Sequence, residues 1–489
     1  MTGRPPPRLR VTALAALLLL LAALPAAAQT LPTGRDAAES LRFPRLEFTP
    51  VEAEQHRIEG VEVIFARDPA LPLVNVFARF RGGYARMDRD FYAAATALPT
   101  LLRSGGTTTL TPDSVNALLD FHAIQLGFGT GGSSSVSSLN TLTEHLDAAL
   151  ELWTDILRNP RFDPDQVEVW RGQELERVLR REDNPTGLAF SEFNRLMYGD
   201  HTIGWEMAPA DLEPERLTGD VLSLVHGEIF CRDHLILGVT GDVSWREIEP
   251  RLRAILAEWP ACPRELPEPP PPDIRREAAV YLIPKALNQT TVVLAHPGGI
   301  RQEDSRDYYA SRIGNSILGG GGFSSRLMAR VRTERGYAYS ASSLWTAPSE
   351  SEGLIGAVTQ TRAGSTVAAV RTILEVMQEM VDERPTREEV SDAIDEIVNG
   401  FVFNFEHRAQ IVSRQMFYVA EDLPANWLEL YVEGIQRVTP ADVRRVFRRH
   451  LRPSDMTILL VGDLEAFDEP PESLGPLRIL EPGAPVPPR

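Results

Sequence analysis

The chain has 489 residues, which is too long for one hydrophobic core, so two or more domains of ordinary size are predicted. Hydrophobic residues make up 43% of the chain and charged residues 24%, a balance typical of globular proteins. The formal charge is −18, and the acidic excess is spread along the sequence. Nucleic acid is excluded as a partner, because binding it needs a basic surface that neutralises phosphates.

The first segment of the chain has the features of a secretory signal peptide. Three arginines precede a leucine- and alanine-rich run, and the small residues Ala26 and Ala28 stand before Gln29. Removal of residues 1–28 would take away three positive charges and change the charge from −18 to −21. We therefore expect a periplasmic or secreted product with no membrane contact after cleavage. An uncleaved membrane anchor is the alternative.

The two cysteines, Cys231 and Cys262, both follow the predicted signal peptide. An oxidising compartment permits a disulfide between them. They do not have CxxC spacing, however, and a sequence does not show whether two Cα atoms lie within bridging distance. A disulfide and two buried free thiols both remain open.

Two segments of the chain repeat one pattern. Thr218–Gly241 and Thr439–Gly462 each begin at a threonine suited to cap a helix, continue through an amphipathic helix and an apolar strand, and end at Gly-Asp. The segments "LPLVNVFARFRGG" and "LNQTTVVLAHPGG" correspond in the same way, since each predicts a strand that ends at a glycine pair. The chain is therefore predicted to contain two copies of one unit.

The repeats and a proline-rich stretch divide the chain into segments. "PRELPEPPPPDIRRE" can form neither a helix nor a central strand. The predicted organisation is two similar domains and a proline-rich tail, with the bounds 40–262, linker 263–275, 276–468 and 469–489. In each domain strands alternate with long helices, which predicts an α+β fold with helices packed on a mostly antiparallel sheet. A doubly wound parallel sheet is the alternative.

The second half contains "GGGGFSSRLMARVRTERGYAYS", a glycine run followed by Ser-Arg-Leu, an arginine and, seven residues later, a tyrosine. With the two similar halves and the proline linker, this segment resembles the M16 family of insulinase, pitrilysin and the mitochondrial processing peptidase. The resemblance covers the chain from about Phe43 to Phe467. It implies a zinc peptidase fold in which the first half carries His-x-x-Glu-His on a helix that ends in Gly-Thr.

The zinc motif implied by the resemblance is missing from this chain. With Gly106-Thr107 taken as the family's Gly-Thr, the five motif positions fall on "ALPTL", so Ala97, Thr100 and Leu101 replace His, Glu and His. Zinc needs about three nitrogen, sulfur or carboxylate ligands and an open water position, and alanine and leucine offer no lone pair. We therefore expect no catalytic residue and no bound metal in this chain, and place the zinc in a partner.

Other residues do not replace the motif. The family's third ligand would fall near Glu174 or Glu176, but one carboxylate alone does not hold zinc, so a solvated helix face is favoured. Neither His145 nor His407 has a second histidine four residues before it, which a helical zinc site needs. Pro99 lies inside the degenerate motif and is expected to kink or end the helix.

In the second half, the residues that the resemblance singles out are present. It implies that Arg332 binds the substrate backbone and that Tyr339 helps to hold the tetrahedral intermediate at a partner's zinc site. An arginine fork and a phenolic donor suit a peptide carbonyl and its oxyanion. The alternative is a buried contact between Arg332 and Tyr339 that fixes the turn at Gly336.

The glycine run also has competing interpretations. Four glycines before a helix can cradle phosphate, but no Lys-Ser/Thr follows, so a P-loop is not favoured. The resemblance implies a shorter version of the flexible substrate-sensing loop in the non-catalytic processing-peptidase subunit. A tight turn is the alternative. The predicted substrate-binding glycines are Gly319, Gly320, Gly321 and Gly322.

Taken together, these features predict a non-catalytic M16-like subunit. It would pair with a separate M16-like chain that has an intact His-x-x-Glu-His motif, and the pair would degrade peptides. The alternative from another class is a peptide-binding or assembly protein with no proteolytic partner. An active peptidase with unrecognised ligands is the third and weakest hypothesis. Whether a homodimer forms without the partner stays open.

Overall fold

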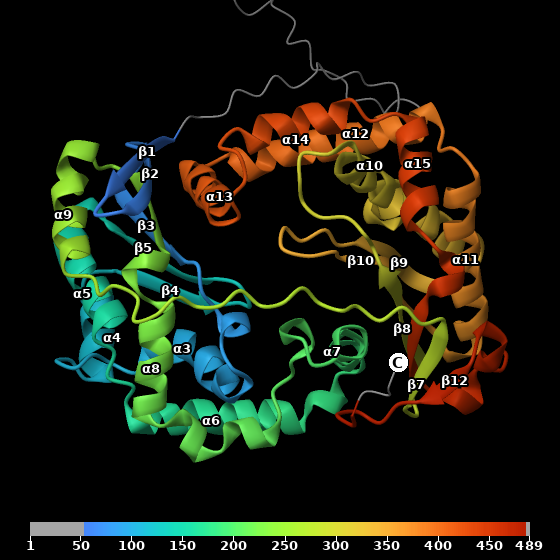
Figure 1. The fold of residues 1–489 in the computed structure, drawn as a ribbon, viewed down its shortest axis with the longest axis horizontal. Helices are drawn as coiled ribbons and strands as arrows, with labels where there is room; N and C mark the ends of the chain where they lie inside the picture. Colours follow the sequence, from blue (N-terminus) through green and yellow to red (C-terminus); the bar gives the residue numbers. More distant parts are fainter. Residues whose placement is uncertain (1–52, 486–489) are drawn as a thin grey trace, which may run out of the picture. The chain divides into compact units, whose positions relative to one another are not determined.

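The computed structural model describes residues 53–485 of the chain (Figure 1). The predicted signal peptide, 1–28, lies outside the described residues. The described residues cluster by their contacts into one unit. Between residues 53 and 485, no helix combines the length and the apolar character needed to cross a membrane.

The first half of the described chain forms a six-stranded sheet in the order β1-β2-β6-β3-β5-β4. All neighbouring pairs are antiparallel except β2 and β6. Strand β3 alternates half-buried and buried side chains along its whole length, as expected for a strand with one face on the core. The strands are β1 (Glu54–Ile58), β2 (Val61–Arg67), β3 (Leu73–Phe80), β4 (Gln125–Thr130), β5 (Ser135–Leu142) and β6 (Leu235–Gly241).

The second half forms another six-stranded sheet, in the order β12-β7-β11-β8-β10-β9. Only β7 pairs in parallel, with β11 and β12. The predicted α+β fold is confirmed, and the doubly wound parallel alternative is wrong, because strands adjacent in each sheet are mostly antiparallel. The strands are β7 (Ala279–Pro284), β8 (Gln289–Pro297), β9 (Ala338–Trp345), β10 (Leu354–Arg362), β11 (Thr457–Gly462) and β12 (Leu477–Ile479).

The internal repeat is confirmed by two equivalent helix–strand pairs. Thr218 caps α8 (Gly219–Ile229) by accepting a hydrogen bond from the Val221 backbone N–H, and Thr439 caps α15 (Pro440–His450) by accepting one from the Asp442 backbone N–H. Each helix leads into a fully buried strand, β6 or β11, at the same place in its sheet. The two sheets therefore share one chain path over five strands.

Helices cover one face of each sheet, and Figure 1 shows α5 and α9 beside the first sheet and α11 and α15 beside the second. Because parallel strands must be joined by crossovers, each half needs such helices. The helices of the first half that belong to its core are α3 (Tyr92–Ser104), α4 (Pro112–Phe121), α5 (Leu146–Arg158), α6 (Pro164–Leu179), α8 and α9 (Trp245–Ala257). Those of the second half, besides α15, are α10 (Arg306–Asn315), α11 (Thr366–Asp382), α12 (Arg387–Val402), α13 (Arg408–Ala420) and α14 (Trp427–Gln436).

Two helices pack on the sheet of the opposite half of the chain. Helix α7 (Pro185–Tyr198) buries Leu188 and Phe193 against the second sheet. Helix α13 buries Val412 and Met416 against Ile64 and its neighbours on the first sheet. Each sheet is therefore covered on its second face by a helix from the other half, and hydrophobic burial joins the two halves.

The segment between the halves contains the proline run. Residues 260–278, which include the predicted linker 263–275, form neither helix nor strand in the described structure. Near the start of this segment, Cys262 forms a disulfide with Cys231, with a Cα–Cα distance of 4.8 Å. Of the two possibilities that the sequence leaves open for these cysteines, the structure has the disulfide.

Candidate functional site

The degenerate motif lies on α3, where it contributes to the core. Ala97, Leu98 and Leu101 are fully buried, and Thr100 is exposed. Of the two effects expected of Pro99, a kink or a helix end, the helix end does not occur, and the helix continues to Ser104, because the packing of its apolar face outweighs the loss of one helical hydrogen bond. Ala97 and Leu101 face other side chains of the core and offer no donor atom to a metal, and the exposed Thr100 offers neither an imidazole nor a carboxylate.

The two carboxylates near the expected third ligand are both paired on α6. The Arg177 guanidinium donates two hydrogen bonds to Glu174, one of them 2.8 Å long, and Arg180 pairs with Glu176. The Glu174 side chain is only 12% exposed, so the arginine compensates a largely buried charge. Both carboxylates therefore belong to ion pairs along the helix.

An aromatic cluster lies at the start of α3. The Tyr92 ring contacts Tyr84 and Trp205 edge-on, with centroid distances of 5.1 and 5.5 Å, and the Arg89 guanidinium lies 4.7 Å from the Tyr92 centroid. Arg89 also donates a hydrogen bond of 2.7 Å to Asp211. Burial, supported by neighbouring Tyr84, raises the pKa of Tyr92 to about 12, so its phenol stays protonated. Sequence reasoning missed this cluster, whose members are far apart in the chain.

The second candidate site is built around Arg332. This residue lies on a π-helical turn, η11 (Met328–Glu334), directly before β9. Its guanidinium carbon is 4.7 Å from the centroid of the Phe323 ring and 4.8 Å from that of the Tyr339 ring. Single π-helical turns inside helices occur frequently at functional sites. The structure therefore brings the two predicted residues together and adds Phe323, which sequence reasoning missed.

The two aromatic rings beside Arg332 are open to solvent. Tyr339 is 80% exposed and Phe323 is 76% exposed. The contact between Arg332 and Tyr339 is therefore a surface contact, and the alternative of a buried pair that fixes the turn does not fit. Exposed aromatic rings on either side of a guanidinium are unusual without a partner, since large apolar groups are normally covered. The available sequence signal was the phenylalanine that directly follows four glycines.

Arg332 differs from the neighbouring arginines in its partners. Arg326 donates two hydrogen bonds, of 2.7 and 3.0 Å, to Glu389. Arg330 donates two, of 3.2 and 3.3 Å, to Glu379. Between residues 53 and 485, Arg332 makes no ion pair and no hydrogen bond from its side chain. Its five N–H donors are available to a ligand while the rings hold the guanidinium plane.

The backbone of β9 places Tyr339 on a bulge. Gln360 of β10 pairs with Ser340, and the next residue, Thr361, pairs with Ala338, so Tyr339 has no partner across the ladder. A bulge of this kind redirects a side chain and is frequent beside active sites. Strand β9 is also the edge of the second sheet. Tyr339 therefore lies on an edge strand, which pairs with β10 on one side and with no described strand on the other.

The glycine run forms helical turns, and packing explains most of it. Gly319 and Gly320 belong to the π-helical turn η9 (Ser316–Gly320) that follows α10. A Cβ atom on Gly319 would lie 2.3 Å from a backbone nitrogen of β9, and one on Gly321 would lie 2.8 Å from Glu396. Gly322 has a φ of +63°, which favours glycine. A role of these four glycines in substrate binding stays a prediction.

The comparisons with known proteins support the family resemblance. A family model described as "Peptidase M16 inactive domain" matches residues 216–397. A non-peptidase homolog, YmxG, of Helicobacter pylori is 23% identical over 404 residues, which span 82% of this chain and 92% of the relative. An uncharacterized zinc protease of Streptomyces coelicolor is 27% identical over 339 residues, 66% of this chain and 72% of that protein.

A solved structure shows the same fold. The chain superposes with a TM-score of 0.76 on a peptidase M16 inactive domain from Pseudomonas fluorescens, with 24% identity over 86% of this chain and 100% of the other. The prediction of an M16-type fold is therefore confirmed. At this identity the likeness extends to the fold and leaves the roles of single residues as predictions.

Proposed function

Since this chain is an M16 homologue with an inactive domain and no metal donors at the motif positions, we propose that it is a non-catalytic subunit of an exported M16-type zinc peptidase. In this proposal a partner chain supplies the His-x-x-Glu-His site and the zinc. This chain supplies Arg332 and Tyr339, which contact the peptide substrate. The relative named a non-peptidase homolog agrees with a chain that is not catalytic on its own.

The observation that carries the proposal is the guanidinium of Arg332, which makes no ion pair or side-chain hydrogen bond with the described residues and lies against two exposed aromatic rings. A guanidinium held in one plane can donate two parallel hydrogen bonds to peptide carbonyls. A phenol at the tip of a bulge can donate to the oxyanion that develops during peptide cleavage. Both groups are mounted on ordered elements, the turn η11 and the strand β9, so little entropy is lost when they engage a substrate.

The edge position of β9 adds a means of holding an extended peptide. An unpaired strand edge presents alternating N–H and C=O groups that a peptide can complete as an added strand. Tyr339 and Arg332 lie at the beginning of this strand and just before it. Main-chain hydrogen bonds would give affinity without sequence preference, which suits a peptidase that degrades varied peptides.

The proposed compartment is the periplasm or the exterior. The signal-peptide features of residues 1–28 and the disulfide between Cys231 and Cys262 support export, because disulfides persist in oxidising compartments. The metal of the proposed complex is zinc, held by the partner.

The proposal is tested with the M16-like chain that has an intact motif and is encoded beside this one or co-purifies with it. The two chains are mixed, and cleavage of a quenched fluorescent peptide is measured with and without a chelator. We expect neither chain to reach full activity alone and the mixture to be strongly active. If no such chain exists, or if mixing changes nothing, the assembly-protein alternative is favoured.

Point variants then separate function from folding. Tyr339→Phe keeps the aromatic ring on Arg332 and removes only the hydroxyl, and Arg332→Lys keeps the charge and removes the planar fork. We expect each to lower turnover by roughly 10-fold or more and to leave the melting temperature within about 2 °C, because Tyr339 is exposed and Arg332 has no ion pair or side-chain hydrogen bond to lose. Arg335→Ala, an exposed arginine on the same segment, is the matched control and should retain wild-type turnover.

The kinetic parameters distinguish the two roles. Loss of the Tyr339 hydroxyl should lower kcat with little effect on KM, since a hydrogen bond to the intermediate is absent in the ground state. Loss of the Arg332 fork should also raise KM, because its charged donors can bind a carbonyl before reaction. A Tyr339→Phe variant that melts lower but cleaves at the wild-type rate per folded molecule would remove this tyrosine from the site.

A further inference from the structure

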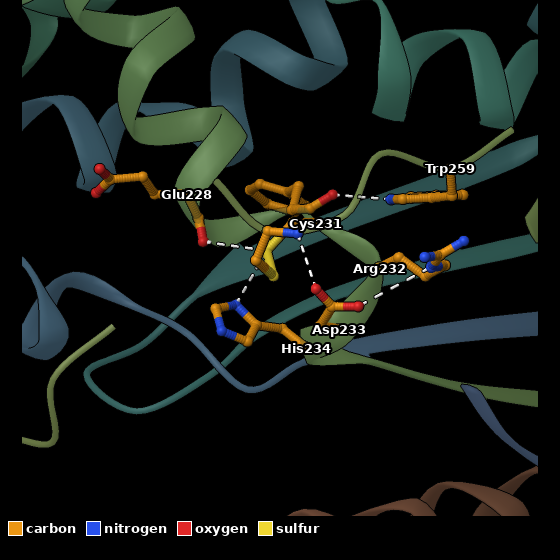
Figure 2. The surroundings of a disulfide bond; sticks show 8 residues. Glu228, Cys231, Arg232, Asp233, His234 and Trp259 are labelled. Carbon is orange, nitrogen blue, oxygen red and sulfur yellow. Dashed lines mark hydrogen bonds and ion pairs between the residues drawn. A yellow bond between two sulfur atoms is a disulfide. The ribbon is translucent and has the colours of Figure 1, made fainter. Parts of the chain in front are cut away.

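Three metal-binding side chains meet beside the first sheet, away from the Arg332 site. Cys231 and Cys262 are joined by an S–S bond of 2.01 Å, and His234 Nδ1 lies 3.3 Å from the Cys231 sulfur. The three ligand atoms all lie within 4.8 Å of one another. Figure 2 shows the imidazole of His234 directed at the disulfide. A disulfide sulfur is a weak partner for a ring nitrogen, so the oxidised state leaves the imidazole nearly unsatisfied on this side.

The segments that carry the two cysteines are held together independently of the disulfide. The Arg232 backbone N–H donates to the Pro260 carbonyl at 2.8 Å, and the Trp259 indole N–H donates to the Phe230 carbonyl at 2.9 Å. The Cys262 backbone N–H donates to Asp233 at 3.0 Å. These three hydrogen bonds, two of which are drawn in Figure 2, should keep the two sulfur atoms adjacent after the S–S bond is broken.

The geometry is close to that of a zinc site. Zinc–sulfur bonds of about 2.3 Å and zinc–nitrogen bonds of about 2.0 Å, in a tetrahedron, place two sulfurs roughly 3.7 Å apart and a sulfur and a nitrogen roughly 3.5 Å apart. The distance from Cys231 Sγ to His234 Nδ1 is already close to this sulfur–nitrogen distance. The two sulfurs must separate, and Cys262 Sγ must approach the imidazole, since these three ligand atoms now lie up to 4.8 Å apart. Side-chain rotations allow both movements at a Cα–Cα distance of 4.8 Å.

A metal site also needs access from solvent. Asp233, His234 and Cys262 line a cavity of about 830 Å³. A metal ion can therefore reach the three ligands, and a water molecule from the cavity can occupy a fourth position.

We propose that Cys231, Cys262 and His234 bind Zn²⁺ when the disulfide is reduced, so that this site alternates between a disulfide and a zinc-bound dithiolate. A dithiol reductant supplies the two electrons: its own sulfurs form a new disulfide while the Cys231–Cys262 bond opens to two thiols. Zinc then displaces the two thiol protons and bonds to both sulfurs, to the histidine nitrogen and to one water. The inference is independent of the peptidase role.

The experiment uses the full mature chain, oxidised or reduced with a phosphine, and Zn²⁺ as the probe. After incubation and anaerobic desalting, we expect about one zinc per reduced chain and less than about one in ten for the oxidised chain. The chain has two cysteines in all, so a thiol reagent should modify two sulfurs in the reduced, metal-free protein and far fewer with zinc bound. Co²⁺ in place of zinc should give the absorption bands of a tetrahedral thiolate site.

The variant His234→Ala keeps both cysteines and the disulfide, and it is the decisive comparison. We expect its reduced form to bind zinc at least 10-fold more weakly than the reduced wild type, with His145→Ala, a histidine outside the cluster, as the matched control. Near-ultraviolet circular dichroism verifies that the reduced chains remain folded. The proposal is overturned if the reduced wild type binds no zinc, if it loses its fold on reduction, or if His234→Ala binds zinc as tightly as the wild type.

Discussion

The disulfide between Cys231 and Cys262 should contribute a measurable share of the stability of the first half. The two residues are 31 positions apart, and they enclose strand β6 and helix α9. In the chain-entropy model, a cross-link closing a loop of this length stabilises the folded state by about 3.5–4 kcal/mol. For a cooperative unit of 150–250 residues this corresponds to roughly 7–15 °C in melting temperature.

The assay is thermal unfolding followed by circular dichroism, with a chelator present so that zinc makes no contribution. Cys231→Ala, Cys262→Ala and the double variant should all melt lower than the oxidised wild type by a similar amount, because either single change removes the whole cross-link. Compared with Cys262→Ala, the double variant should add only the packing loss at the buried Cys231, about 1 kcal/mol. This non-additivity identifies the covalent bond, as opposed to local packing, as the cause.

Reduction of the wild type provides the control. With a phosphine and a chelator present, the wild type and the three variants should melt within about 3 °C of one another, since none then has the cross-link. An oxidised wild type that melts no higher than its reduced form would refute the reasoning. It would show that the hydrogen bonds between residues 230–234 and 259–262 already restrict the chain as much as the disulfide does.

Two further predictions concern the first half. The triple variant Ala97→His, Thr100→Glu, Leu101→His should bind no zinc by elemental analysis. Its free energy of unfolding should be lower by at least about 3 kcal/mol, because two of the three positions are fully buried. Stoichiometric zinc in a stable variant would contradict this. His226 is buried, and burial lowers its pKa to about 4, so the unfolded chain takes up the proton first. Stability should therefore fall by about 3 kcal/mol as the pH drops from about 6.5 to 4, and a His226→Leu variant with the same acid sensitivity as wild type would exclude this histidine as the cause.

The sequence by itself determined the features that depend on residue identity and on local patterns. The repeated threonine caps and Gly-Asp strand ends predicted two copies of one unit, because capping and strand formation involve residues close in the chain. The loss of the zinc motif was equally clear, since no fold gives a lone pair to Ala97 or Leu101. The segment from the glycine run to Tyr339 pointed to the family and to the residues that the structure brings together.

The tertiary structure alone decided how the distant parts of the chain meet. The packing of α7 and α13 on the sheets of the opposite halves joins apolar side chains that are far apart in the sequence, such as Tyr198 and Ala279 or Ile64 and Val412, and local patterns do not encode such contacts. Pro99 predicted a kink or an end in α3, and burial of the helix carried it past the proline to Ser104.

In the candidate sites too, the sequence determined the residue types and the tertiary structure decided their positions. That Tyr339 stands exposed on a bulge follows from the pairing of β9 with β10, and a shift of one residue in that register would turn the ring to the other face of the sheet. The meeting of Cys231, Cys262 and His234 likewise depends on the place where α9 returns the chain to the beginning of β6. The sequence gives the residue types. The distances between side chains that are far apart in the sequence are set only when the strands pair and the helices pack.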